Sequence, residues 1–484
     1  MLATLIQKEL KAIIVSPKFA VSFAVLSILI LLSVYTGIRE YKAAVQKWET
    51  STELAGQQAR EATNWRGLSY KTLRAPDPME ILVSGVNHDI GRWSDIESES
   101  SVKLRHSAYS DDPIFAVFRF VDFAFIVQIV LSLFAVLFTY DAVNGEREGG
   151  TLRLVFSNSV PRAQYLIAKC IGSWLGLVIP ILIPILLSLL LVVVSGVPLD
   201  ATHWACIISL LGLSLLFFTF FITLGVLIST LTRRSNVSFL ISLVAWVSLV
   251  LIIPRAGILA AGQVIHVPRV AEIEGQRDGF AKDLWAQHYK GMEERWREGR
   301  DSADTGEQPD ENAMWERMQM EDSLRREVET RIEEYEVKLL DDLRFRKAAQ
   351  ERLAFTLARI SPVSAYQLGA MSLAGTGIGL KSRYERMMSD YRTRFNDYRE
   401  AKQAASDDPG GGFLSITVSS ETGFKIGTGR DVALDVSDMP QFSPESVTFR
   451  EAFSPSLIDI GILAIGILLT FMGSFLAFLR YDLR

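Results

Sequence analysis

The chain has 484 residues, of which 49% are hydrophobic and 22% are charged, and its formal net charge is −5. A soluble protein of this length is rarely so apolar, and the charged residues crowd between apolar runs, so the composition predicts a membrane part and a sizeable water-exposed part. The acidic balance gives no support for nucleic-acid binding, because proteins that bind phosphate backbones need a basic surface.

Residues 1–18 form an amphipathic stretch along which Lys8, Lys11 and Lys18 are spread. The apolar run that follows is of full membrane length and has no clean small-residue cleavage site, which argues against a removable signal peptide. We therefore expect an interfacial helix over Leu2–Ser16 that lies along the membrane surface and leads into the first membrane helix.

Six apolar runs are each long enough to cross a hydrocarbon core, which takes about 20 helical residues. They lie at 19–38, 114–140, 168–195, 204–230, 237–254 and 456–479. Pro180 and Pro184 should kink the third helix, and the fifth should end at Pro254–Arg255. The pattern predicts an α-helical membrane fold with six transmembrane helices after an N-terminal interfacial helix.

The short loops carry a consistent bias of basic residues, which marks the cytoplasmic side of a membrane protein. Basic residues occur in 1–18, in the loop 141–163, in the turn after the fourth run and in the C-terminal tail, whereas the loop 196–203 has none. We therefore expect a multi-pass protein of the bacterial inner membrane with both termini in the cytoplasm. The long segments 39–113 and 255–455 would then lie on the outer face.

The two long polar segments predict different structures. In 39–113, the Ala- and Gln-rich part 39–63 should continue the first helix outward, and the remainder, with Pro76, Pro78 and Gly85, should be loop. The segment 255–455 predicts a mostly helical extracytoplasmic domain with a small β-containing part. The β part would form where ITV and VALDV alternate within 407–452.

Within 255–455, apolar residues at helical spacing are surrounded by alternating acids and bases, which predicts a long amphipathic helix. The apolar stripe comprises Leu324, Val328, Ile332, Tyr335 and Leu339. Its partners could be 270–300 and 381–405, with 304–310 as one turn. The apolar segment 357–377 is too interrupted to span a membrane, so it should lie at the membrane surface or pack under the helices.

The loop between the second and third runs has the most informative sequence, YDAVNGEREGGTLRLVFSNSVPRAQYLIAK over 140–169. It begins with acidic residues, contains a double glycine, continues with a short amphipathic helix from Thr151 to Ser157, and ends at Pro161–Arg162. A short helix that is parallel to the membrane and tightly joined to two membrane helices would act as a rigid handle. A partner that pushed this handle would move both membrane helices together.

This stretch resembles the signature of ABC-2-type transporter permeases, in which an acidic E-x-E/R-x-G-T-L segment is followed by a Pro/Ser-Arg pair and a lysine. The matching positions are Glu146, Glu148, Gly150, Thr151, Leu152, Pro161, Arg162 and Lys169. The interfacial helix and the six membrane helices fit the same family. The long segment before the last run is similar to the subgroup with a large extracytoplasmic insertion before its last transmembrane helix.

The resemblance implies the transmembrane subunit of an exporter, which is not itself an enzyme and has no cofactor of its own. Two ATP-binding subunits, which hold ATP and magnesium, would join two permease chains, as a homodimer or a heterodimer, within the membrane lipid. The loop 141–163 would be the coupling helix that docks in a groove of the ATPase. Its contact residues would be Glu146, Glu148, Thr151, Leu152 and Arg153.

Other interpretations of the same residues remain open. An ordinary cytoplasmic loop with a capping threonine would explain 141–163 without a coupling role. The long outer helices could instead act as levers on a periplasmic partner, in a mechanotransmission complex that moves no substrate. A membrane-bound enzyme is disfavoured, because the sequence has no nucleophile–base motif and no two of its five histidines stand at metal-ligand spacing.

Arg119 and Asp122 stand three residues apart in the outer half of the second apolar run. Ionisable groups inside a membrane are costly and often functional. The two residues could pair locally at i, i+3 spacing, or they could take part in gating or in the pathway of a substrate.

Overall fold

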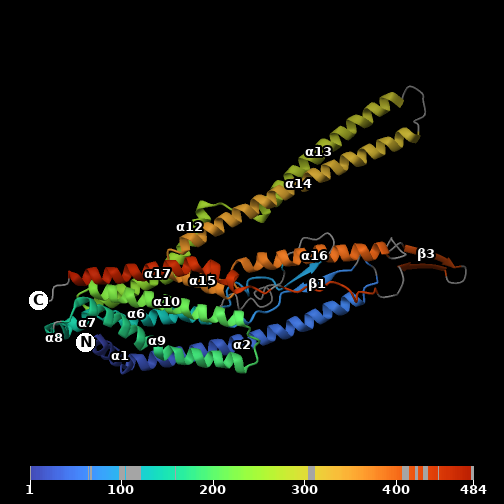
Figure 1. The fold of residues 1–484 in the computed structure, drawn as a ribbon. Coiled ribbons are helices and arrows are strands. Elements are labelled where there is room, and N and C mark those ends of the chain that lie inside the picture. Colours follow the sequence, from blue (N-terminus) through green and yellow to red (C-terminus); the bar gives the residue numbers. More distant parts are fainter. Residues whose placement is uncertain are drawn as a thin grey trace. The chain divides into compact units, whose positions relative to one another are not determined.

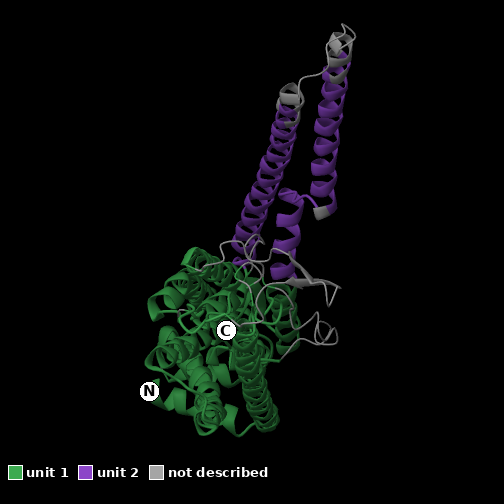
Figure 2. Ribbon diagram, turned by 90° about the vertical axis from the view of Figure 1, so that its right-hand side faces the viewer, with its two compact units in different colours: residues 1–251, 361–484 green, residues 252–360 purple. Residues whose placement is uncertain are grey.

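The computed structural model describes residues 2–63, 65, 68–96, 104, 121–158, 160–303, 311–405, 414–419, 423–428, 434–444 and 446–480. The chain folds into two compact units, which Figure 2 distinguishes by colour. Unit 1 comprises residues 1–251 and 361–484, and unit 2 comprises residues 252–360.

Among the described residues, six helices are long and apolar enough to cross a membrane, which confirms the predicted class of fold. They are α2 (Pro17–Arg60), the segment Phe123–Glu148, α9 (Arg162–Val194), α10 (Ala201–Leu231), the segment Ser235–Val264 and α17 (Phe449–Leu479). The helix α1 (Leu2–Ile14) precedes them. Within unit 1, α9, α10 and α17 lie side by side (Figure 1).

The second membrane helix is built from several pieces. Its parts are α5 (Phe123–Phe125), the π-helical segment η2 (Ile126–Leu131), α6 (Ser132–Thr139) and α7 (Asn144–Glu148). The predicted run began at residue 114, and residues 114–120 lie outside the described ranges. The third helix, α9, stays helical through both of its prolines, Pro180 and Pro184.

Helical structure does not end at Pro254–Arg255, where we expected the fifth membrane helix to end. Helical structure continues from α11 (Ser235–Val247) through the π-helical segment η3 (Ser248–Ile252) into α12 (Ile253–Val264). Pro254 lies in the first turn of α12. The π-helical turn already interrupts the regular hydrogen-bond ladder there, so the missing N–H of proline costs little and the helix can continue.

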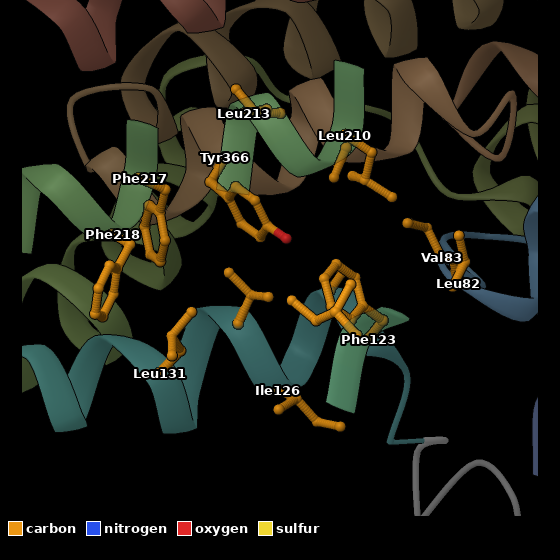
Figure 3. Close-up of a cluster of buried hydrophobic side chains, with 14 of the residues drawn as sticks. Leu82, Val83, Phe123, Ile126, Leu131, Leu210, Leu213, Phe217, Phe218 and Tyr366 are labelled. Carbon is orange, nitrogen blue, oxygen red and sulfur yellow. The ribbon is translucent and has the colours of Figure 1, made fainter. Parts of the chain in front are cut away.

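The core of unit 1 lies where α10 meets α15 (Pro362–Leu373). Tyr366 from α15 is fully buried between side chains of α10 on one side and of α5 and η2 on the other (Figure 3). Its ring stacks on Phe217 with 4.6 Å between centroids, and its hydroxyl lies 3.2 Å from Oγ of Ser214. The interrupted apolar segment 357–377 therefore supplies a buried helix to this core.

At the end of unit 1 away from α1, the long helix α2 packs against small elements that the sequence did not reveal. These are the 3-10 turn η1 (Pro78–Ile81) and the antiparallel hairpin of β1 (Tyr70–Leu73) and β2 (Trp93–Ile96). We expected only loop here. The two strands have four residues each and are separated by η1, so no local hairpin signal exists.

The helix α16 (Gly379–Ala405) completes this end of unit 1. It buries Tyr391 and Phe395 in one cluster with Tyr70 of β1 and Ala55 of α2. Its apolar face is therefore covered by α2 and the hairpin. The prediction that 381–405 also pairs with the long amphipathic helix was therefore wrong, because the apolar face of α16 is already covered.

Unit 2 contains the predicted pair of long helices, α13 (Val270–Ala303) and α14 (Glu311–Ala358). Phe280 stacks on Tyr335 at 4.1 Å between centroids, and Nε of Arg295 donates to Glu321 at 2.9 Å. Val328 of the predicted stripe is buried. The expected long amphipathic helix and its partner 270–300 are thus confirmed, whereas the expected turn at 304–310 lies outside the described residues.

The small β-containing part is an antiparallel hairpin of β3 (Leu414–Ser419) and β4 (Gly423–Thr428). The predicted ITV strand lies in β3, but VALDV is not its partner. Residues 434–436 of VALDV are irregular, and the backbone N–H of Leu434 donates to the carbonyl of Ala62 at 2.8 Å. The alternation of apolar and polar residues in VALDV also suits an extended loop that is held by backbone hydrogen bonds to another segment. Alternation alone therefore does not identify a strand.

Candidate functional site

Two short helices form the loop between the second and third membrane helices, α7 (Asn144–Glu148) and α8 (Thr151–Ser157). Gly150 joins them with φ of +71°, a left-handed conformation that costs about 1–2 kcal/mol for a residue with a side chain. The hydroxyl of Thr151 donates to the carbonyl oxygen of Glu146 at 3.2 Å. The double glycine therefore makes a tight turn that sets α8 against α7.

Glu146 occupies the centre of a charged cluster. Its Oε1 accepts from Nζ of Lys8 at 2.6 Å and from Nζ of Lys169 at 3.0 Å, and its Oε2 accepts from the hydroxyl of Tyr165 at 2.7 Å. Nζ of Lys169 also donates to Oε1 of Glu9 at 2.8 Å. The side chains of Lys169 and Glu146 are only 5% and 13% exposed, so water screens the cluster weakly. One carboxylate thus connects α1, α7 and α9.

Two glycines on α9 allow α1 to approach closely. A Cβ atom on Gly172 would lie 2.5 Å from Cβ of Glu9, and a Cβ atom on Gly176 would lie 3.2 Å from Cδ1 of Ile13. These residues are four positions apart and therefore share one face of α9. The close approach places Glu9 of α1 within reach of Lys169, which lies on α9 with the two glycines.

Glu148 and Asn144 attach the loop to the beginning of α11. Oε2 of Glu148 accepts from Oγ of Ser235 at 2.6 Å, and Oε1 accepts from its backbone N at 3.1 Å. A carboxylate in this position satisfies an otherwise unpaired N–H and interacts favourably with the helix dipole. Nδ2 of the fully buried Asn144 donates to Oγ1 of Thr232 at 2.9 Å, in the turn between α10 and α11.

Leu152 attaches α8 to the interior. It is 3% exposed and belongs to a cluster with Tyr165 of α9, Val226 of α10 and Phe478 of α17. The rings of Tyr165 and Phe478 stack at 5.3 Å between centroids, at an interplanar angle of 15°. Any displacement of Leu152 would therefore act directly on three membrane helices.

Pro161 and Arg162 connect the end of the loop to the end of the chain. Pro161 is the N-cap residue of α9, and Arg162 is its first residue. Nη1 of Arg162 donates to the backbone oxygens of Leu479 and Phe478 at the last turn of α17. Carbonyls at a helix C-terminus lack intrahelical partners and favour a cation, so Arg162 caps α17.

The predicted contact residues divide into two sets by exposure. Glu146 and Leu152 face inward, whereas Thr151 and Arg153 are exposed. Leu154, which the prediction omitted, is 67% exposed. Residues two apart on a helix point to nearly opposite sides, so a buried Leu152 implies an outward Leu154. The sequence alone does not show which of the two leucines is buried, so it could not identify Leu154 as the exposed one.

Asp122 lies at the start of the second membrane helix instead of inside its outer half. It is the N-cap residue of α5, where Oδ1 accepts from the backbone N of Phe125 at 2.7 Å. Its Oδ2 accepts from the backbone N and Oγ of Ser84 at 2.9 and 2.8 Å. These bonds give Asp122 a structural role as a cap. Arg119 lies outside the described residues, and the gating role stays a prediction.

Glu146, Glu148, Arg162 and Lys169 are therefore paired with other side chains or with helix ends. Within the described ranges, no three His, Cys, Asp or Glu side chains gather as a possible metal site. The arrangement links a small exposed helix to several membrane helices, and it can transmit a displacement from that helix.

Comparison with protein families finds a match over most of the chain. The model of a family described as ABC-2 family transporter protein matches residues 3–387, which include α1, the loop 141–163 and five of the six membrane helices. No curated protein matches the chain.

Proposed function

The chain belongs to the ABC-2 family as the permease subunit of an ABC transporter, and we propose that a separate ATPase subunit drives it through α8. One observation carries this proposal. The exposed side of α8 presents Arg153 and the 67% exposed Leu154, while Leu152 on the other side is buried against membrane helices. An exposed apolar residue beside a charged one suits a docking contact with an apolar pocket and a polar rim.

The connections around α8 suggest how force would spread. A push on α8 reaches α9, α10 and α17 through the cluster of Leu152. It reaches α1 through Glu146, α11 through Glu148, and the end of α17 through Arg162. In this mechanism, ATP binding closes the ATPase dimer, α8 and α1 move together, and the membrane helices tilt as rigid elements.

The complex that follows has two ATPase subunits, which hold ATP and magnesium, and two permease chains in a bacterial inner membrane. The basic residues of 1–18 and 141–163 support a cytoplasmic location for both termini and for α8. Export of the substrate is the direction that the resemblance to ABC-2-type permeases implies. Asn158→Cys, on the exposed end of α8, would test the orientation, because a cytoplasmic cysteine resists an impermeant maleimide in intact cells but reacts with it once the membrane is permeabilised.

The coupling role is tested by co-purification of the full-length permease with its ATPase subunit. We expect Leu154→Ser and Arg153→Glu to release the ATPase from the full-length permease and to abolish transport-coupled ATP turnover. Matched controls are Leu231→Ser and Arg233→Glu, which alter exposed residues of the same types beyond α8. Retention of the ATPase by both α8 variants would refute the proposal.

A second candidate function is mechanotransmission, in which the helices of unit 2 act on a periplasmic partner without moving a substrate. It is favoured by apolar residues on α14 that the described part of α13 leaves exposed. Val337, Leu340 and Phe345 are 52%, 37% and 74% exposed. Photo-crosslinking from position 345, with the polar position 341 as control, would capture a defined protein partner under this alternative. Substrate export by a chain with Phe345→Ser and Val337→Ser would favour transport instead.

A further inference from the structure

The two units are joined where the chain enters and leaves unit 2. Unit 2 is one continuous stretch, so the chain passes between the units once before Ile252 and once after Ile360. The first passage lies in the π-helical segment η3. The second lies in a turn, because Arg359 and Ile360 follow the last residue of α14. Regular α-helical structure is therefore interrupted at both passages.

Pro254 removes the backbone donor that the π-helical pattern assigns to one carbonyl of η3. In a π-helix the carbonyl of residue i accepts from the N–H of residue i+5. For Leu249 that residue is Pro254, which has no N–H. Because an unpaired backbone carbonyl inside a membrane helix is unfavourable, a donor from another part of the chain stabilises this turn.

Ser361 supplies a donor at this place. Its Oγ donates to the carbonyl oxygen of Leu249 and accepts from the backbone N–H of Val363 at 3.2 Å. Ser361 is fully buried, and it is the N-cap residue of α15. Both Leu249 and Ser361 belong to unit 1. One hydroxyl group thus links the segment before the first passage to the residue that follows the second.

The packing on either side of the passages is close. In unit 1, Nε1 of Trp246 on α11 donates to Oγ of Ser132 on α6 at 2.8 Å, and α15 belongs to the core. In unit 2, a Cβ atom on Gly257 of α12 would lie 2.9 Å from the backbone N of Ala358 on α14. Closely packed elements move as rigid bodies, and the motion is taken up by a few residues at the ends of elements.

We propose that the junction of the two units is a pivot on which unit 2 turns relative to unit 1, and that the hydroxyl of Ser361, bonded to the carbonyl of Leu249, restrains this turning. Helices bend at prolines and at π-helical turns, and both occur at the first passage. The restraint involves no residue of α8, so it does not rest on the coupling role. Either assignment can fail while the other stands.

Distances between pairs of spin labels test the pivot in the full-length chain in lipid nanodiscs. Cys170→Ala and Cys206→Ala give a background without native cysteines. One pair reports on both units and uses the exposed positions of Lys42→Cys on α2 and Lys338→Cys on α14. The reference pair uses Lys42→Cys and Arg60→Cys, which both lie on α2. Double electron–electron resonance then gives the distance distribution of each pair, and only the first pair should respond to the pivot.

Ser361→Val and Ser361→Thr form a matched pair, because the two side chains have similar size and only threonine keeps the hydroxyl. Loss of one hydrogen bond shifts an equilibrium about 2- to 10-fold, so Ser361→Val should raise the share of distances outside the parental peak by such a factor. Ser361→Thr should keep the parental distribution. Ser16→Val is the control for the loss of such bonds elsewhere, because Oγ of Ser16 also donates to a carbonyl and accepts from an N–H.

Pro254→Ala tests the reason for the restraint. It restores an N–H five residues after Leu249, so the carbonyl of Leu249 no longer depends on Ser361. The double variant Ser361→Val/Pro254→Ala should therefore have a narrower distribution than Ser361→Val alone. The proposal would be overturned by equal distributions in Ser361→Val and Ser361→Thr, by equal broadening in Ser16→Val, or by no narrowing in the double variant.

Discussion

The cluster around Glu146 makes a graded prediction, because its members differ in burial. Lys169→Met removes the cation that joins Glu9 to Glu146, so Glu9 loses its ion pair with Lys169, and Glu146 keeps Tyr165 and Lys8, which is 49% exposed. Glu146→Gln removes the shared carboxylate but leaves Lys169 paired with Glu9. Lys8→Met removes only the exposed member. We therefore expect the loss of stability to fall in the order Lys169→Met, Glu146→Gln, Lys8→Met.

The magnitudes follow from the same geometry. Removal of one partner from a buried ion pair costs about 3–5 kcal/mol, and the side chain of Lys169 is only 5% exposed. Hydrogen bonds to charged groups contribute about 1.5–3 kcal/mol, which sets the scale for Glu146→Gln. An exposed ion pair contributes about 0–1 kcal/mol, so Lys8→Met should be nearly neutral. Residues in one network are coupled, so the double variant should lose less than the sum of its two single variants.

Thermal unfolding of the purified full-length chain in one detergent measures this order. The melting temperatures of the three single variants and of Glu146→Gln/Lys169→Met are compared with that of the parent at one pH and one salt concentration. If Lys8→Met lowered the melting temperature as much as Lys169→Met, the buried network would not be the stabilising unit. Strict additivity of the double variant would contradict the shared hydrogen bonds.

Three further predictions use the same melting assay. A Cβ atom on Gly225 of α10 would overlap Oγ1 of Thr139 on α6, so Gly225→Ala should cost about 1–3 kcal/mol and Thr139→Ala should restore part of this loss. Equal losses with and without the second change would refute the close contact. Gly150→Ala should lower the free energy of unfolding by about 1–2 kcal/mol, because Gly150 has a left-handed φ of +71°. Gly149→Ala should lower it less, because the φ of Gly149 is −77°. The reverse order would exclude the left-handed turn. Burial raises the pKa of Glu80 from 4.5 to about 7. Between pH 4.5 and pH 7 the folded chain therefore binds more protons at Glu80 than the unfolded chain does. The contribution of Glu80 to the free energy of unfolding consequently falls as the pH rises through this range. The melting temperature of Glu80→Gln minus that of the parent should therefore increase from pH 5 to pH 7, and a constant difference would contradict the raised pKa.

The membrane helices could be predicted from the sequence because the property that a bilayer selects is local. About 20 consecutive apolar residues identify such a helix without knowledge of its neighbours. The end of the fifth helix could not be predicted in this way. Whether Pro254 ends a helix depends on the hydrogen bonds of the turn before it, and nothing in the sequence announces the π-helical segment Ser248–Ile252.

The loop 141–163 shows a different limit. Its short helix over Thr151–Ser157 was predicted with the bounds that the structure shows, because the double glycine and the apolar spacing are local. The inward roles of Glu146 and Leu152 depend on partners far along the chain. Lys8 is 138 positions from Glu146, and Phe478 lies near the other end of the chain. A motif therefore identified the segment, but only packing separated its exposed residues from its buried ones.

The close packing of α1 on α9 means that α1 cannot reach its final position until α9 has been synthesised. The surface of α9 that contacts α1 includes Gly172, Gly176 and Lys169. Lys169 is 160 positions downstream of its partner Glu9. At about 5–20 residues per second, a ribosome needs roughly 8–32 s to add that stretch. During this interval α1 cannot pack on α9, and Glu9 has no Lys169 to pair with. Synthesis and folding of α9, the third membrane helix, is therefore the step that allows α1 to reach its final position.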